Sequence, residues 1–160
     1  MTDAWVVNAS PLILFARVER FDLFEQLAPK FIVPEAVLDE IRAGQAKDPT
    51  ANGALNWAVQ HSLPNLPVPA SIEHWDLGAG ESQVIAHGLA VSRWVVLDDL
   101  AARRCAVAHG LSVIGSLGIV LRAKERGFLS EARPWVNKLK AAGMFVDDGL
   151  LNQALAGIGE

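Results

Sequence analysis

Cysteine, long apolar runs and histidines in a metal-binding pattern are scarce or missing in this sequence. Cys105 is the only cysteine among the 160 residues, which excludes an internal disulfide and favours a reducing compartment. No apolar run approaches the ~18 residues that span a bilayer, and the N-terminus lacks the basic and apolar regions of a signal peptide. The four histidines show no metal-ligand spacing to the cysteine or to one another. We therefore expect a cytoplasmic protein without membrane contact.

Internal repeats, low-complexity tracts and interdomain linkers are also absent, so the sequence predicts a single domain over residues 1–160. Apolar residues make up 51% of the chain and charged residues 20%, a composition typical of a globular protein. The mean hydropathy of +0.26 is high for a small chain and indicates that a partner covers part of the apolar surface. We expect a homodimer that associates through apolar side chains of its helices.

Charge is distributed unevenly along the chain. The net charge of −4 by itself argues against nucleic-acid binding. Residues 101–140, however, carry eight basic and two acidic side chains, whereas residues 1–100 carry six basic and thirteen acidic side chains. Two interpretations stay open: a basic surface that holds a phosphate backbone beside an acidic metal site, or helices with ordinary solvated charges.

Short apolar runs alternate with helical patterns, which predicts β-α-β units and a parallel sheet. The first helix is expected to have Ser10 as its N-cap and Pro11 at its first helical position. Two C-terminal helices from about residue 130 are expected to pack on the core. The expected strands are Trp5–Val7, Phe31–Val33, Leu66–Val68, Trp94–Leu97 and Ser112–Ile114.

Polar side chains lie where such a sheet would gather them. Asn8 closes the first apolar run, and Asp98 and Asp99 close the fourth. Glu40 lies in the last turn of a helix that Pro34 opens, and Glu81 begins a helix over 81–90. Ligands of open parallel sheets bind outside the carboxyl ends of the strands, and converging oxygen ligands suit a hard divalent cation. Each residue alone has an ordinary explanation as a helix cap or a surface charge. The hypothesis of a metal-dependent site therefore depends on all of these side chains lying together at one end of the sheet.

Four segments of the sequence, in order, resemble the motifs of PIN domains. Val6–Ile13 is similar to the first strand and turn, where the family usually has Asp-Thr-Ser, and Pro34–Ile41 to the third helix. Gly80–Ala86 is similar to the helix start that carries Asp-Ala-hydrophobic-Ile-Ala, and Leu97–Asp99 to the Thr-Arg/Asn-Asp turn. The texts "Gly-Glu-Ser…Ile-Ala", "Leu-Asp-Asp…Ala-Arg-Arg" and "Gly-Ser-Leu-Gly" together resemble a prokaryotic VapC-like subgroup.

The resemblance implies a three-layer α/β/α sandwich with a central parallel sheet of about five strands. It also implies a ribonuclease that uses Mg²⁺ or Mn²⁺ on single-stranded RNA, and many relatives are toxins paired with a small antitoxin protein. The acidic positions of the family fall on Glu40, Glu81 and Asp99, with Asp98 beside them either as a ligand or to orient the attacking water. These four residues are the expected catalytic set, and Glu81, Asp99, Glu40 and Asn8 are the expected metal ligands.

Asn8 is the main departure from the family pattern. Its amide oxygen still coordinates a hard cation but brings no negative charge, so we expect weaker metal binding. For the substrate, Arg103 lies one helical turn beyond Asp99, where a guanidinium can meet a phosphate oxygen. Ser10 and Ser116 are expected to bind a phosphate, a metal-bound water or a ligand carboxylate, with helix capping as the alternative for both.

Two rival hypotheses belong to other classes. Because of Asn8, the chain is also interpreted as a catalytically weak protein of the same fold that binds RNA or a protein partner. The other rival is a different flavodoxin-like fold such as a receiver domain. A receiver needs its acidic pair after the first strand, whereas here the pair follows the fourth, so this rival ranks last.

Overall fold

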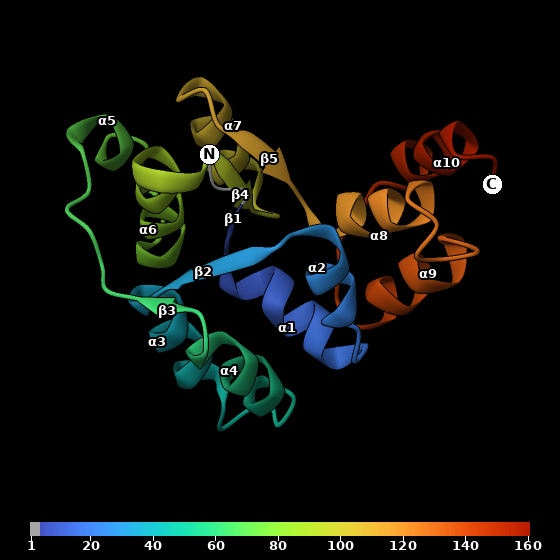
Figure 1. Ribbon diagram of the computed structural model, residues 1–160, viewed down its shortest axis with the longest axis horizontal. Coiled ribbons are helices and arrows are strands. Elements are labelled where there is room, and N and C mark those ends of the chain that lie inside the picture. The colour runs from blue at the N-terminus through green and yellow to red at the C-terminus, as the bar shows by residue number, and fades with distance from the viewer. Residues whose placement is uncertain (1–3) are drawn as a thin grey trace.

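The computed structural model describes residues 4–160, so residues 1–3 of the expected domain lie outside the described residues. A five-stranded parallel sheet with the order β3-β2-β1-β4-β5 forms the centre of the molecule, as Figure 1 shows. This result confirms the predicted α/β fold with a parallel sheet of about five strands. The strands are β1 (Ala4–Val7), β2 (Lys30–Pro34), β3 (Ser62–Leu63), β4 (Trp94–Val96) and β5 (Ser112–Ile114).

Helices connect the strands and cover both faces of the sheet. α1, α3 and α4 contact one another, α2 contacts α8, and α6 contacts β1, β2 and α7. Figure 1 shows α1, α3 and α4 on one side of β2 and α6 on the other side. The helices are α1 (Ala9–Arg17), α2 (Asp22–Leu27), α3 (Glu35–Gly44), α4 (Ala51–Val59), α5 (Ala70–Glu73), α6 (Ala79–His87), the π-helical η1 (Gly88–Ser92), α7 (Leu100–Ala108), α8 (Ser116–Glu125), α9 (Arg133–Ala141) and α10 (Asp148–Gly157).

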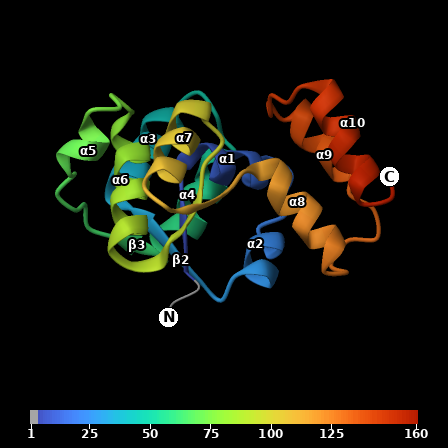
Figure 2. The same ribbon diagram turned by 90° about the horizontal axis from the view of Figure 1, so that it is seen from above.

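The core explains why the strand sequences are so apolar. All four residues of β1 are buried, as expected for a parallel strand with helices on both faces. Figures 1 and 2 both show α9 and α10 at the end of the molecule away from α5. Leu139 of α9 and Leu155 of α10 still belong to the same buried apolar cluster as the sheet. Within residues 4–160, no helix has the length and apolar character needed to cross a membrane.

The prediction of a strand at Leu66–Val68 is wrong. This segment is a loop, and the short edge strand is β3, whose Ser62 pairs with Val33 of β2. Gln83 explains the difference, because its side-chain amide accepts a hydrogen bond from the Leu66 N–H at 2.8 Å and donates one to the Leu66 carbonyl at 2.7 Å. A side chain thus satisfies the backbone groups that a neighbouring strand would otherwise bind.

Two predicted helix starts are also wrong. Asn8, not Ser10, occupies the N-cap position of α1, and Ser10 lies within the helix. α6 begins at Ala79, earlier than the predicted start at Glu81, so Gly80 is helical.

Candidate functional site

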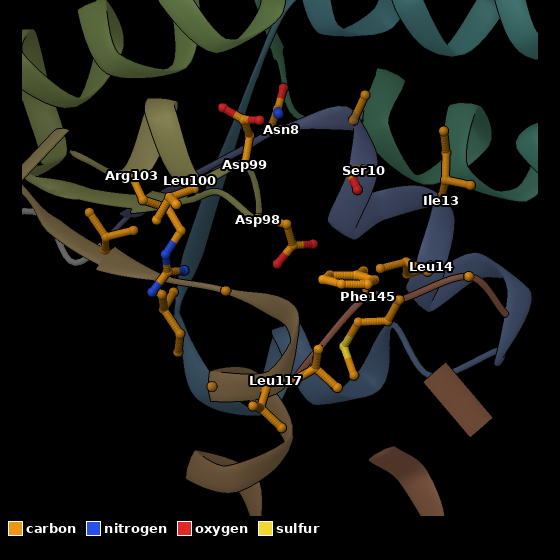
Figure 3. A pocket seen from close by; sticks show the side chains of 18 of the residues that line it. Asn8, Ser10, Ile13, Leu14, Asp98, Asp99, Leu100, Arg103, Leu117 and Phe145 are labelled. Atoms are coloured by element: carbon orange, nitrogen blue, oxygen red, sulfur yellow. The ribbon is translucent and has the colours of Figure 1, made fainter. Parts of the chain in front are cut away.

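Strand register brings the polar ends of β1 and β4 together. Val7 of β1 pairs with Val96 of β4, and the N–H of Asn8 donates to the Val96 carbonyl at 3.2 Å. Along the chain, β2 and β3 are added to the sheet on one side of β1, and β4 and β5 are added on the other side. The strand order therefore reverses between β1 and β4. A crevice at such a reversal is the usual ligand site of open parallel sheets. Figure 3 shows Asn8 and Asp99 side by side at this point.

A cleft of about 1170 Å³ opens at this edge of the sheet. All the acidic candidates from the sequence, Glu40, Glu81, Asp98 and Asp99, line it together with Asn8. Apolar side chains of α1, α8 and the segment between α9 and α10 line the rest of it. No ion pair formed by residues 4–160 includes any of these four carboxylates. None of these four carboxylates is therefore neutralised by an ion pair, although Arg17 and Arg103 also line the cleft.

Glu40 reaches the cleft because Gly80 has no side chain. The Oε1 atom of Glu40 accepts a hydrogen bond from the Gly80 N–H at 2.9 Å, which links α3 to the first turn of α6. A Cβ atom at position 80 would lie 2.7 Å from Oε1 and 2.8 Å from the carboxyl carbon of Glu40. Sequence reasoning missed this role, since nothing in the local pattern shows that a distant carboxylate approaches this glycine.

We expect the Gly80→Ala substitution to forfeit most of the stability, about 1 kcal/mol, that alanine brings to a helix in place of glycine. The added methyl group must displace the exposed, flexible end of the Glu40 side chain and break its hydrogen bond with the Gly80 N–H, which costs about 0.5–1.5 kcal/mol in the free energy of unfolding. Urea denaturation of wild type and variant measures this change. Gly53→Ala in α4 is the matched control, because its Cβ meets only the Ala16 Cβ at 4.0 Å.

A double variant with Glu40→Ala identifies the cause of that loss. If the Glu40 carboxylate is what the new methyl group meets, Gly80→Ala should stabilise the protein more once Glu40 is truncated. An equal change in the free energy of unfolding in both backgrounds would contradict the close approach of these two residues.

Glu81 is electrostatically coupled to the other acids. Its Oε2 atom accepts a hydrogen bond from the Gly78 N–H at 3.3 Å in the first turn of α6. Burial of this half-buried side chain raises the pKa of its carboxyl above the ordinary value, and the negative charges of Asp99 and Glu40 raise it further. The hydrogen bond from Gly78 opposes this shift. Glu81, Asp99 and Glu40 thus share one electrostatic environment, which favours either a bound proton or a bound cation.

The adjacent aspartates make different contacts. Asp98 accepts two hydrogen bonds from Ser116, from its N–H at 2.7 Å and from its hydroxyl at 2.6 Å, so both carboxylate oxygens are engaged. Asp99 is the N-cap of α7, where its Oδ2 atom accepts from the Ala102 N–H at 3.0 Å. Asp99 is exposed, and its Oδ1 atom forms no hydrogen bond within residues 4–160. Asp99 therefore has one carboxylate oxygen left to bind a ligand. Both oxygens of Asp98 are used to connect the end of β4 to the start of α8.

The three expected substrate-binding residues are placed differently. Ser10 and Arg103 line the cleft, and Arg103 donates from Nη1 to the Leu97 carbonyl at 2.8 Å. Its other N–H groups form no hydrogen bond within the described part of the chain. Ser116 is fully buried behind Asp98 and does not line the cleft. Ser116 therefore does not reach a substrate in the cleft, but its hydroxyl donates to Asp98, which is the contact with a candidate carboxylate that was among those expected for it.

Asn8 carries the one buried polar atom among the described side chains that lacks a hydrogen-bond partner. The residue is 4% exposed, and its Oδ1 atom has no donor. A buried acceptor without a partner costs about 1–3 kcal/mol, so such atoms often mark a ligand position. An amide oxygen beside carboxylates is the donor chemistry that hard cations such as Mg²⁺ and Mn²⁺ prefer.

Within residues 4–160, however, no three acidic, histidine or cysteine side chains lie close enough to form a metal-binding group by themselves. The case for a cation therefore rests on the unpartnered Asn8 Oδ1 atom and on the negative charges of Asp99 and Glu40, which act on Glu81.

Comparison with known proteins agrees with the motifs and the sheet order. A family model described as a PIN domain matches residues 4–160, nearly the whole chain. No curated protein matches the sequence. The family match confirms the resemblance to PIN domains, which are generally nucleases and therefore hydrolases. This chain belongs to the PIN-domain family.

Proposed function

We propose that this protein is a Mg²⁺- or Mn²⁺-dependent endoribonuclease that cuts single-stranded RNA. The observation that carries the proposal is the unpaired Asn8 Oδ1 atom at a cleft that Glu81, Asp99 and Glu40 also line, where none of these three carboxylates forms an ion pair within the described residues. Membership of a family of nucleases sets the reaction class. The single-stranded RNA substrate comes from the resemblance to the VapC-like subgroup.

Each side chain of the cleft has a defined task in this proposal. Asn8, Glu81, Asp99 and Glu40 would hold the cation, which when bound supplies the charge that polarises a phosphate and acidifies water. The raised pKa of Glu81 belongs to the metal-free protein, and a bound cation would favour the ionised carboxylate that serves as its ligand. Arg103 lines the cleft and has guanidinium N–H groups left for a phosphate oxygen. Asp98 positions α8 through Ser116 and does not act on the substrate.

The expected partners stay part of the proposal. We infer a homodimer, and a small antitoxin protein as the regulator of the nuclease. Support comes from apolar side chains left on the surface, among them Leu100, Val107 and Leu150, which are 59%, 64% and 57% exposed. Exposed apolar groups of this kind are typical of surfaces that a protein partner covers.

Cleavage of labelled single-stranded RNA tests the function directly. We expect cleavage in the presence of Mn²⁺ or Mg²⁺ and none in EDTA, because without a cation the carboxylates repel the phosphate and no group activates water. Readdition of Mn²⁺ should restore activity, which separates metal removal from denaturation. Cleavage that continues at full rate in EDTA, with the metal content verified as zero, would rule out the metal-dependent mechanism.

A catalytically weak binding protein is the second candidate. Asn8 in place of the family's usual first acid, and the absence of a compact three-acid group among residues 4–160, favour it. RNA that binds to the protein but stays intact at every Mn²⁺ concentration would select this candidate over the nuclease.

A further inference from the structure

The segment between α9 and α10 borders the same cleft as the carboxylates. Along this segment Met144 and Val146 pack against the core, whereas Phe145 between them is 97% exposed and lines the cleft. Because its two neighbours occupy the inward positions, Phe145 must point away from the core. Figure 3 shows its ring next to Leu14, on the same side of the cleft as Asp98.

Both ends of this segment are fixed by side chains. Arg17 of α1 donates a hydrogen bond to the Ala142 carbonyl at 2.6 Å. At the other end Lys140 forms an ion pair with Asp148 at 2.7 Å. The ring of Phe145 is therefore held at the cleft on an anchored segment. With 97% of its surface exposed it adds almost nothing to the stability of the core.

We propose that Phe145 is a stacking platform for a nucleobase of single-stranded RNA, next to the phosphate that lies at the carboxylates. This inference rests on the proposed function, since it names how the same cleft holds its substrate. Both faces of the ring are open to solvent, as base stacking requires. Arg103 also lines the cleft and has N–H groups left for a phosphate of the backbone, whereas Arg17 is ion-paired with Asp48 at 2.6 Å. Stacking uses the π-face that every base has, so this contact gives affinity with little sequence preference.

Binding and kinetics of three Phe145 variants test the inference. Fluorescence anisotropy of a labelled single-stranded oligoribonucleotide is measured in an Asp99→Asn background, where the RNA stays intact. Removal of one stacked base contact should raise Kd at least about fivefold for Phe145→Ala and Phe145→Leu, whereas Phe145→Trp should bind at least as well as the parent. In the protein that keeps Asp99 and can cut RNA, Phe145→Ala should raise KM for cleavage and leave kcat nearly unchanged. Phe128→Ala is the matched control, because Phe128 is an exposed phenylalanine outside the cleft lining.

The outcomes separate this inference from the proposed function. RNA cleavage with the same KM and Kd for wild type and Phe145→Ala would overturn the stacking role and leave the nuclease intact. Weaker RNA binding by the alanine and leucine variants, in a protein that never cuts, would support stacking and remove the nuclease. If Phe145→Ala instead dissociates a dimer in sedimentation and binds RNA normally, the ring belongs to a protein interface and the inference fails. Equal behaviour of leucine and phenylalanine at this position would also exclude stacking, since leucine is apolar but has no ring.

Discussion

Replacing Asp99 by asparagine is expected to abolish Mn²⁺-dependent RNA cleavage while the fold stays intact. Asp99 has two tasks, and asparagine can perform only one of them. As N-cap of α7 it accepts a hydrogen bond from the Ala102 N–H, and an asparagine amide oxygen can accept the same bond. As a proposed metal ligand it contributes a full negative charge that the amide lacks. We therefore expect the variant to lose function through its charge and not through its stability.

The size of this effect follows from what the cation supplies. Metal-assisted stabilisation of the transition state is worth several kcal/mol, so the cleavage rate should fall at least about 100-fold. Thermal unfolding of both proteins without metal checks that the melting temperature changes little. Asp39→Asn is the matched control, because it removes the same charge from an exposed side chain of α3 that lies outside the cleft. An Asp99→Asn protein that cuts at the wild-type rate would show that the acidic cluster does not support the reaction.

The second large effect is expected from Asn8→Asp, which restores the acid that the family usually has at this position. A carboxylate beside a divalent cation stabilises it more than an amide dipole does, and the 4% exposure of this site reduces solvent screening. We expect Mn²⁺ to bind about tenfold more tightly or better, equivalent to about 1.4 kcal/mol, and ribonuclease activity to rise. Calorimetric titration of Mn²⁺ into both proteins measures the affinity. Unchanged affinity would mean that Asn8 does not contact the metal.

The same substitution should destabilise the metal-free protein at neutral pH. The new carboxylate adds repulsion to a cluster in which the pKa of Glu81 is already raised by burial, Asp99 and Glu40. A raised pKa in the folded state means that the penalty is absent below the ordinary carboxyl range, near pH 4, and develops as the pH rises through the raised value. The melting temperature of Asn8→Asp should therefore fall below that of wild type at pH 7, approach it at low pH, and recover with Mn²⁺. Asn137→Asp in α9, an exposed site outside the cleft, should show none of these changes.

Much of the fold could be predicted because the information is local. β1 and β4 are continuous apolar runs, and their boundaries agree with the predicted ones to within one residue. The strand predicted at Leu66–Val68 failed because a residue from another element, Gln83, binds the backbone of Leu66. No local pattern contains that contact.

The sequence by itself determined the family, the parallel sheet and the acidic residues at the strand ends, because apolar periodicity and motif order are properties of neighbouring residues. Only the tertiary structure decided how those residues divide their tasks. It paired Asp98 with Ser116, left Asp99 open to the cleft, and placed Glu40 against Gly80. It also buried the Asn8 Oδ1 atom without a donor and left Phe145 exposed at the opening of the same cleft. Each of these features depends on the distance between residues far apart in the chain, and packing alone sets that distance.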